Sequence, residues 1–260
     1  MLNLKKEADN LQSNELLLGR CPICEAFVYH LYYMQDADTK KRSKWYACSC
    51  GVVWQAQKPS GIYDIKYWQK YNIPDDNHKI RDTYEYPIRI YSPIIEELIY
   101  GRKVLLIGRQ NTYQEDYFGQ RGWIAYSIDK NTCFKNSDRI IASDFETHQF
   151  NPDVKFNLIW MYHTLESFLD PKAALAKCIS LLPEDGIIFI ATPDTDFINT
   201  RSSSNFIHWK AEYNSIMWNK RSLTRQLDSL GLNVILARSN YEHRFPVWDD
   251  VHLLAQKKFF

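Results

Sequence analysis

Four of the six cysteines lie in one short N-terminal window, and their spacing is typical of metal ligands. Cys21 and Cys24 form a C-x2-C pair, while Cys48 and Cys50 are separated by a single residue. Alternate residues of a strand share a face, so the shorter pair can still bring both sulfur atoms to one ion. Four thiolates suit a structural zinc site with no open coordination position. His30 is an alternative ligand, although it falls in the middle of an expected strand.

Acidic residues and a histidine recur at the ends of apolar segments in the second part of the chain. Asp129 follows Gly108 by 21 residues, and Asp144 and His163 end or follow two further apolar runs. Ligands of open α/β sheets bind at the carboxyl ends of the strands, so these side chains are expected to face one site. A histidine there can act as a general base near neutral pH. The alternative is that His163 only braces its loop together with Glu166.

A second histidine lies in the insertion 194–219, which precedes the last helical segment. Long loops at this edge of a sheet are usually lids or substrate walls. His208 and Trp209 are therefore candidates for contact with a substrate. The spacing of Trp209, Tyr213, Ile216 and Met217 also fits a helix that packs on the core, and this is the favoured interpretation for Trp209, whereas His208 is left open.

The elements that position these residues alternate along the chain. Near-continuous apolar strands separated by helical segments predict a mostly parallel sheet with helices on both faces. The last two strands are close enough in sequence to form an antiparallel pair. The expected strands lie at 104–108, 123–129, 139–144, 156–162, 187–192, 233–238 and 251–257.

Capping residues mark the expected helices. Ser92 as the cap, Pro93 at the first helical position and Gly101 as the stop predict one helix. Thr112 followed by Glu115 forms a capping-box pattern for the next helix. The segments 170–186 and 221–231 are expected to be a capped helix and an amphipathic helix.

The overall composition limits the classes of function. The 260 residues are 45% hydrophobic and 24% charged, which suits one full domain with a small appendage. Lys and Arg (32) balance Asp and Glu (31), so no long-range field favours nucleic acid or a membrane surface. No apolar stretch approaches the length of a membrane span, and we expect a cytoplasmic protein. The other two cysteines, Cys133 and Cys178, are expected to be core residues.

The motifs at the strand ends resemble those of the class I S-adenosylmethionine-dependent methyltransferases. That family ends its first strand with a "VLDIGCGTG"-like stretch, its second with an acid and its third with an acid and an apolar residue. An "HVLEH"-like motif follows its fourth strand. The stretches here are "VLLIGRQNT", "YSID", "ASDFE" and "YHTLES". The resemblance covers roughly residues 90–258 and implies an α/β fold with a seven-stranded Rossmann-like sheet.

The resemblance also implies roles for the residues at the sheet edge. Asp129 would bind the ribose hydroxyls of S-adenosylmethionine, and Asp144 would accept from the exocyclic amine of adenine. Phe145 would pack on the base. His163 would line the active site as its wall or its base, and His208 would lie beside the acceptor.

The N-terminal region resembles a zinc-ribbon module. "CPIC", "CSCGVVWQ" and "YDIKYWQKY" are similar to the module that precedes such a domain in some methyltransferases, including enzymes of sugar and surface-polysaccharide pathways. The expected cofactors are S-adenosylmethionine and a structural zinc ion, and the expected reaction is O-methylation of a small molecule or glycan. A protein partner or a homodimer is left open. The expected organisation is a lead-in (1–15), a zinc ribbon (16–60), an aromatic bridge (61–91) and a methyltransferase-like domain (92–260).

The loop after the first strand departs from the family. Gly108 is kept, but Leu106 replaces an acid and bulkier residues follow, including Arg109 and Asn111. One interpretation is that Arg109 or Asn111 meets the methionine carboxylate through a charge-assisted hydrogen bond. The other is that the pocket is blocked, and that the domain is a catalytically silent module that binds protein or RNA.

Overall fold

The structure is a computed structural model that describes eight stretches of the chain. These are residues 19–28, 30–36, 40–56, 78–108, 113–130, 138–196, 210–239 and 250–258. The expected lead-in lies outside them, as does most of the expected aromatic bridge. In the part of the chain that is described, no helix is both long enough and apolar enough to cross a membrane.

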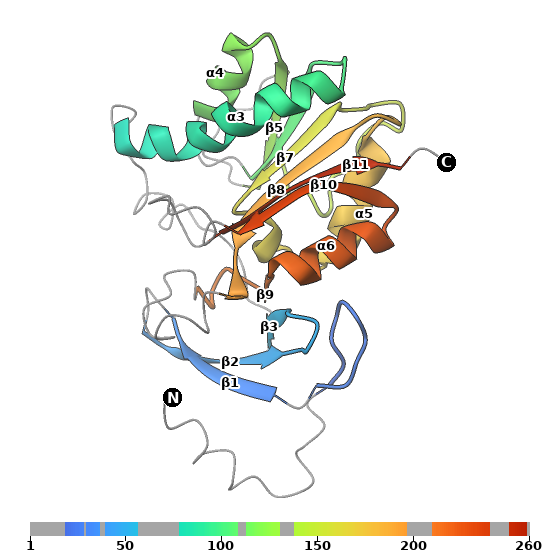
Figure 1. The fold of residues 1–260 in the computed structure, drawn as a ribbon. Helices are drawn as coiled ribbons and strands as arrows, with labels where there is room; N and C mark the ends of the chain where they lie inside the picture. Colours follow the sequence, from blue (N-terminus) through green and yellow to red (C-terminus); the bar gives the residue numbers. More distant parts are fainter. Residues whose placement is uncertain are drawn as a thin grey trace, which may run out of the picture.

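A seven-stranded sheet forms the larger part of the molecule (Figure 1). Its strand order is β10-β11-β8-β7-β4-β5-β6, and only β11 runs antiparallel to its neighbours. This result confirms the predicted α/β class and the antiparallel final pair. The strands are β4 (Lys103–Ile107), β5 (Ile124–Asp129), β6 (Ile140–Ala142), β7 (Leu158–Tyr162), β8 (Ile187–Pro193), β10 (Leu232–Ser239) and β11 (Asp250–Lys257).

Helices cover both faces of this sheet (Figure 1). Helices α3 (His78–Leu98) and α4 (Tyr113–Gln120) pack on one face, with Ile88, Ile95 and Phe118 in the core beneath them. Helices α5 (Pro171–Leu181) and α6 (Lys220–Ser229) pack on the other. Because both faces are covered, every residue of β7 and β8 is buried. The long apolar runs in the sequence follow from this arrangement.

Helix α3 corrects one prediction. We expected a helix capped by Ser92, but α3 begins at His78 and contains both Pro87 and Pro93. Ser92 is fully buried inside the helix. Ile88, Tyr91, Ile95 and Ile99 all belong to the core on that side of the sheet. Burial of this apolar stripe stabilises the helix through both prolines, although each proline removes a backbone donor.

The other helix starts follow their capping residues. Asp170 caps α5, since its side chain accepts from the Ala173 amide at 3.0 Å, as predicted. Asn219 and Ser222 form a capping box at the start of α6, which we had not predicted. The predicted cap Thr112 lies outside the described residues, and α4 begins directly after it.

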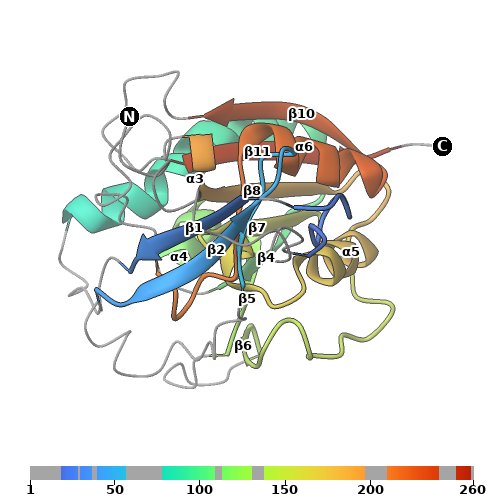
Figure 2. The ribbon, with the colours of Figure 1, turned by 90° about the horizontal axis from the view of Figure 1, so that it is seen from below.

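A four-stranded antiparallel sheet forms the smaller part of the molecule, below the large sheet in Figure 1. Strands β1 (His30–Gln35), β2 (Arg42–Ala47) and β3 (Val53–Gln55) come from the N-terminal region. Figure 2 shows β1 and β2 from below, across the direction of the large-sheet strands. The fourth strand, β9 (Ile216–Met217), comes from the insertion that follows β8. The sequence did not indicate that β9 would belong to this sheet. The pairing of β9 with β3 joins the two parts of the molecule.

Candidate functional site

The candidate active site lies at the carboxyl edge of the large sheet. β7, β4, β5 and β6 are parallel neighbours in that order. The residues that follow or end these strands are His163, Gly108, Asp129 and Asp144 respectively. The structure therefore brings together at one edge the residues for which the sequence predicted a common site.

Only glycine fits well at position 108, because of its backbone conformation and the closeness of the Thr164 side chain. The φ of Gly108 is +80°, and an added Cβ would lie 2.2 Å from Oγ1 of Thr164. The Thr164 hydroxyl donates to the carbonyl of Ile107 at 2.9 Å, so it fixes the end of β4 against the loop after β7. Arg109 and Asn111, which follow, lie outside the described residues, and so does His208. Their roles remain predictions.

The two predicted acids lie at the ends of neighbouring strands. Asp129 is the last residue of β5, and its carbonyl accepts from the amide of Ser143 at 2.9 Å. Asp144 follows Ser143, and its Oδ1 accepts from the Glu146 amide at 2.8 Å. Both acids are partly exposed. A ligand that reached this edge would therefore meet two carboxylates.

The ring of Phe145, for which the resemblance implies a contact with the base, lies among other aromatic side chains. Its side chain is 3% exposed and packs against Phe150 and Phe168, with ring centroids 6.1 and 5.8 Å away. Other side chains cover much of this ring, and its expected packing on a base stays a prediction. Within the described part of the chain, the Phe145 amide donates no hydrogen bond. The backbone at this position is the part that a ligand could use.

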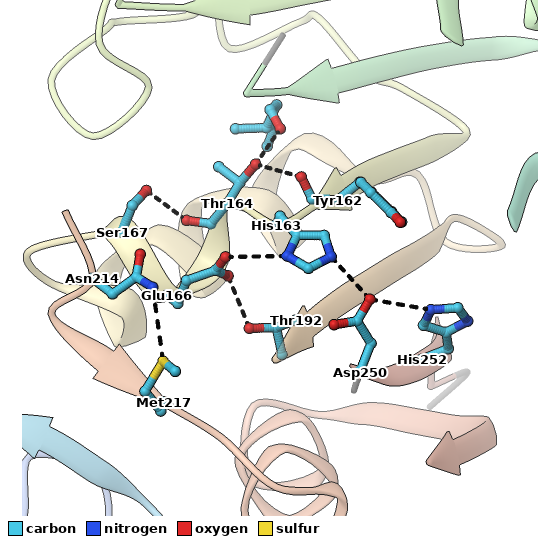
Figure 3. A network of polar contacts seen from close by, with 11 residues as sticks. Tyr162, His163, Thr164, Glu166, Ser167, Thr192, Asn214, Met217, Asp250 and His252 are labelled. Carbon is cyan, nitrogen blue, oxygen red and sulfur yellow. Dashed lines mark hydrogen bonds and ion pairs between the residues drawn. The ribbon is translucent and has the colours of Figure 1, made fainter. Parts of the chain in front are cut away.

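His163 lies between two carboxylates from different parts of the chain (Figure 3). Its Nε2 is 2.9 Å from Oδ2 of Asp250, at the start of β11. Its Nδ1 is 3.8 Å from Oε1 of Glu166, in the 3-10 helix η1 (Leu165–Ser167). The φ of His163 is +49°, which is unfavourable for a residue other than glycine. Strained backbone of this kind is often kept where it serves function.

The two carboxylates change how readily His163 releases its proton. Burial alone would lower the pKa of His163, but the charges of Asp250 and Glu166 outweigh burial and raise it above the ordinary value of 6.5. Burial also raises the pKa of Glu166, against the opposing charge of His163. The site therefore holds a basic imidazole next to carboxylates, as proton-transfer sites do.

Hydrogen bonds and ion pairs continue on either side of His163 (Figure 3). Thr192 donates to Oε2 of Glu166 at 2.8 Å. On the other side, His252 Nε2 lies 3.9 Å from Oδ2 of Asp250, and His252 Nδ1 is 3.0 Å from the Tyr91 hydroxyl. Sequence reasoning missed the role of Asp250. Its place at the same carboxyl edge depends on the antiparallel pairing of β11 with β8, which no local pattern in the sequence shows.

The four predicted metal ligands are brought together in the small module. The sulfur atoms of Cys21, Cys24, Cys48 and Cys50 all lie within 4.8 Å of one another, and none is in a disulfide. The Cys21–Cys50 and Cys24–Cys48 sulfur distances are 3.8 and 3.4 Å. Tetrahedral zinc with bonds of ~2.3 Å would place its sulfur ligands ~3.8 Å apart. The hydrogen bond with Cys50 lowers the pKa of Cys21 to about 5. The donor set therefore fits zinc.

The small module is connected to the active site through the segment that contains β9. The side-chain amide of Gln55 donates to the carbonyls of Ala211 and Asn214, at 2.5 and 2.6 Å. The backbone amide of Gln55 donates to the carbonyl of Ser215 at 2.9 Å. The backbone amide of Ser215 donates in turn to the carbonyl of Glu166 at 2.7 Å. This path of hydrogen bonds leads from the small sheet to the residue beside His163.

Known structures share this fold. The chain is 12% identical to a chain of the complex between the Haloferax volcanii Trm112 methyltransferase activator and a methyltransferase, with a TM-score of 0.54; 75% of this chain and 97% of that chain are covered. The plantazolicin methyltransferase BamL, bound to a triazolic desmethylPZN analog and SAH, is 14% identical (TM-score 0.51; 74% and 90% covered). The methyltransferase CcbJ from Streptomyces caelestis is 11% identical (TM-score 0.50; 69% and 90% covered).

The sequence itself matches a protein family. No curated protein matched the chain. The methyltransferase domain family matches residues 80–237, which include α3, the parallel strands of the large sheet, His163 and most of β10. This match covers more than half of the chain. The protein therefore belongs to the methyltransferase domain family.

Proposed function

We propose that this protein transfers the methyl group of S-adenosylmethionine to a hydroxyl group of a small molecule or glycan. The observation that carries the proposal is His163, which lies between Asp250 and Glu166 at the carboxyl edge of a methyltransferase sheet. A hydroxyl is a poor nucleophile until a base removes its proton, and His163 is the proposed base because of its two carboxylate neighbours at this edge. A glycan is included as a candidate acceptor because the N-terminal module resembles the zinc ribbon of methyltransferases from sugar and surface-polysaccharide pathways.

The cofactor is expected to bind across the ends of β4, β5 and β6. In the proposed complex, Asp129 binds the ribose, Asp144 accepts from the adenine amine and the Phe145 amide donates to the base. Gly108 lets the backbone approach the amino-acid part, where Arg109 or Asn111 is the expected partner of the carboxylate. Bound S-adenosylmethionine supplies an electrophilic methyl group on sulfur.

The chain then has to align an acceptor and remove its proton. In the proposed mechanism, Asp250 orients the imidazole and stabilises its protonated form, while Nδ1, on the Glu166 side, takes the proton from the acceptor hydroxyl. Alignment of two reactants can itself contribute roughly 7 kcal/mol or more. The four cysteines would hold a structural zinc ion, which stabilises the small module and takes no part in the reaction.

Cofactor binding is the first test. Addition of S-adenosylmethionine or S-adenosylhomocysteine at ~100 times its Kd should raise the melting temperature by about 5 °C. Asp129→Ala should remove this shift without unfolding the chain. The matched control is Asp153→Ala, at an exposed position, which should keep the shift.

The outcomes separate the two interpretations of the loop after β4. If well-folded protein shows no shift with either ligand, the enzyme proposal fails and the silent binding module takes its place. If the shift survives Asp129→Ala, the ribose assignment is wrong. For the acceptor, purified protein should be incubated with methyl-labelled cofactor and fractionated sugar and metabolite pools. Label in an ether group would support O-methylation, and label on nitrogen or carbon would contradict it.

A further inference from the structure

Lys177 of α5 reaches the loop that follows β6, where the proposed base-binding residues lie. Its ammonium group donates to the carbonyl of Phe145 at 2.5 Å, to that of His148, and to that of Glu146 at 3.5 Å. It also lies 4.8 Å from the ring centroid of Phe145 and 5.7 Å from that of Phe150. A lysine has three donors, and three carbonyls meet them here. Burial lowers the pKa of Lys177.

One of these contacts acts on Asp144 through a single peptide group. The carbonyl of Phe145 and the amide of Glu146 belong to the same planar unit, and they point in opposite directions. The carbonyl accepts from Lys177, while the amide donates to Oδ1 of Asp144. A charged donor on the carbonyl polarises the peptide and strengthens the bond made by its amide. Lys177 therefore helps to fix the orientation of the Asp144 carboxylate.

The same loop is held to α5 at a second point. The carboxylate of Glu146 accepts from the amides of Leu169 and Asp170, at 3.1 and 2.8 Å, just before α5 begins. Two opposite charges therefore connect the loop to the start and to the middle of α5. If Lys177 is lost, Glu146 still attaches the loop, so the loop can lose its orientation without the fold being lost.

We infer that Lys177 is a positioning residue for the base of the cofactor, because it sets the 145–146 peptide that orients Asp144. This inference rests on the proposed function. Its consequence is selectivity for a 6-amino purine, since an oriented Asp144 accepts from an amine and repels a carbonyl oxygen. A lysine that only stabilised the fold would not affect this selectivity.

The experiment compares two ligands that differ only in the base. Binding of S-adenosylhomocysteine and of S-inosylhomocysteine, in which a carbonyl replaces the 6-amino group, should be measured by calorimetry. The wild type should bind the adenine compound at least about tenfold more tightly. Lys177→Met should weaken binding of that compound about tenfold and bring the two Kd values close together. Lys177→Arg, which keeps the charge and carbonyl donors, should restore most of the preference.

Lys172→Met is the matched control, because this lysine lies on the same helix and its side chain is 42% exposed. Both Kd values should stay at their wild-type level. An unchanged preference in Lys177→Met, with only a lower melting temperature, would overturn the inference. If Lys177→Met does not fold, Lys177→Gln, which keeps an N–H donor group without the charge, should show a smaller loss of preference. Failure of the wild type to bind either ligand would refute the proposed function, before any variant is measured.

Discussion

The two sheets of this protein are stabilised in different ways. The large sheet lies between two extended apolar clusters, and the residues of β7 and β8 are all buried. Among the described residues, Met34, Trp45 and Met217 form a separate small cluster in the small module, whereas its Val28, Val52 and Ile216 belong to one of the clusters of the large sheet. So small a core cannot offset the conformational entropy of the module, which needs a metal or a neighbouring domain. The large sheet is held by its own packing, whereas the small one packs partly on the larger part and is expected to depend on its proposed zinc ion as well.

Removal of two cysteines should have the largest effect. Cys21→Ser combined with Cys50→Ser leaves two of the four expected ligands, and structural zinc sites contribute about 10 kcal/mol or more of apparent binding free energy. Elemental analysis should show loss of zinc. Hydrogen exchange of β1, β2 and β3 should accelerate by about 100-fold or more, while β7 and β8 keep their protection.

Cys178→Ala is the control for the loss of a thiol. Cys178 is buried in the core of the large sheet, so the variant should keep its zinc even if it is less stable. If hydrogen exchange in the Cys21→Ser/Cys50→Ser variant accelerated equally in both sheets, the two regions would unfold as one unit. The proposed difference in how the two sheets are stabilised would then be wrong.

Loss of the imidazole should have the next largest effect, on rate and not on folding. His163→Ala should lower kcat by roughly 10²- to 10⁴-fold, the usual contribution of a general base. The Kd of the cofactor should change little, since His163 is not expected to touch it. His252→Gln should cost much less, because His252 reaches His163 only through Asp250. A His163→Ala variant with wild-type kcat would show that this residue only braces its loop.

The pH dependence of the rate tests whether His163 is the base. The base must be unprotonated, so the rate should rise with pH and reach a plateau above the pKa of His163. Because Asp250 and Glu166 raise that pKa, the midpoint should lie above 6.5. Asp250→Asn removes one negative charge and should move the midpoint to lower pH. A midpoint that does not move would mean that another group limits the rate.

Gln55→Leu should have the smallest effect, and it tests whether the small sheet supports the active site. The variant leaves the carbonyls of Ala211 and Asn214 without their donor and loosens the segment next to Glu166. We expect a loss of kcat of about fivefold and of stability of about 1–2 kcal/mol. Gln35→Leu, in the same module but with its amide on the exposed carbonyl of Lys40, is the control and should be neutral. Equal kcat values for Gln55→Leu and Gln35→Leu would show that the small sheet does not support the active site.

Residues that are close in sequence could be interpreted well from sequence alone. The strands, the capped helix that starts at residue 170 and the paired cysteines depend on local patterns, and the structure places the carboxyl ends of the strands within two residues of the predicted ones. Asp250 could not be assigned, because its place beside His163 depends on an antiparallel pairing with β8. The predicted start of α3 was wrong, because the prediction gave more weight to the helix-breaking prolines than to the buried apolar stripe of the helix.

The pairing of β9 with β3 has a practical consequence for work on this polypeptide. Ile216 and Met217 are almost completely buried, and β3 supplies the hydrogen-bonding neighbour of β9. A shortened gene that began at α3 would encode a protein with an uncovered apolar edge, and such edges recruit other chains. Expression of the methyltransferase domain alone should therefore give aggregates, whereas the 260-residue chain should stay monodisperse.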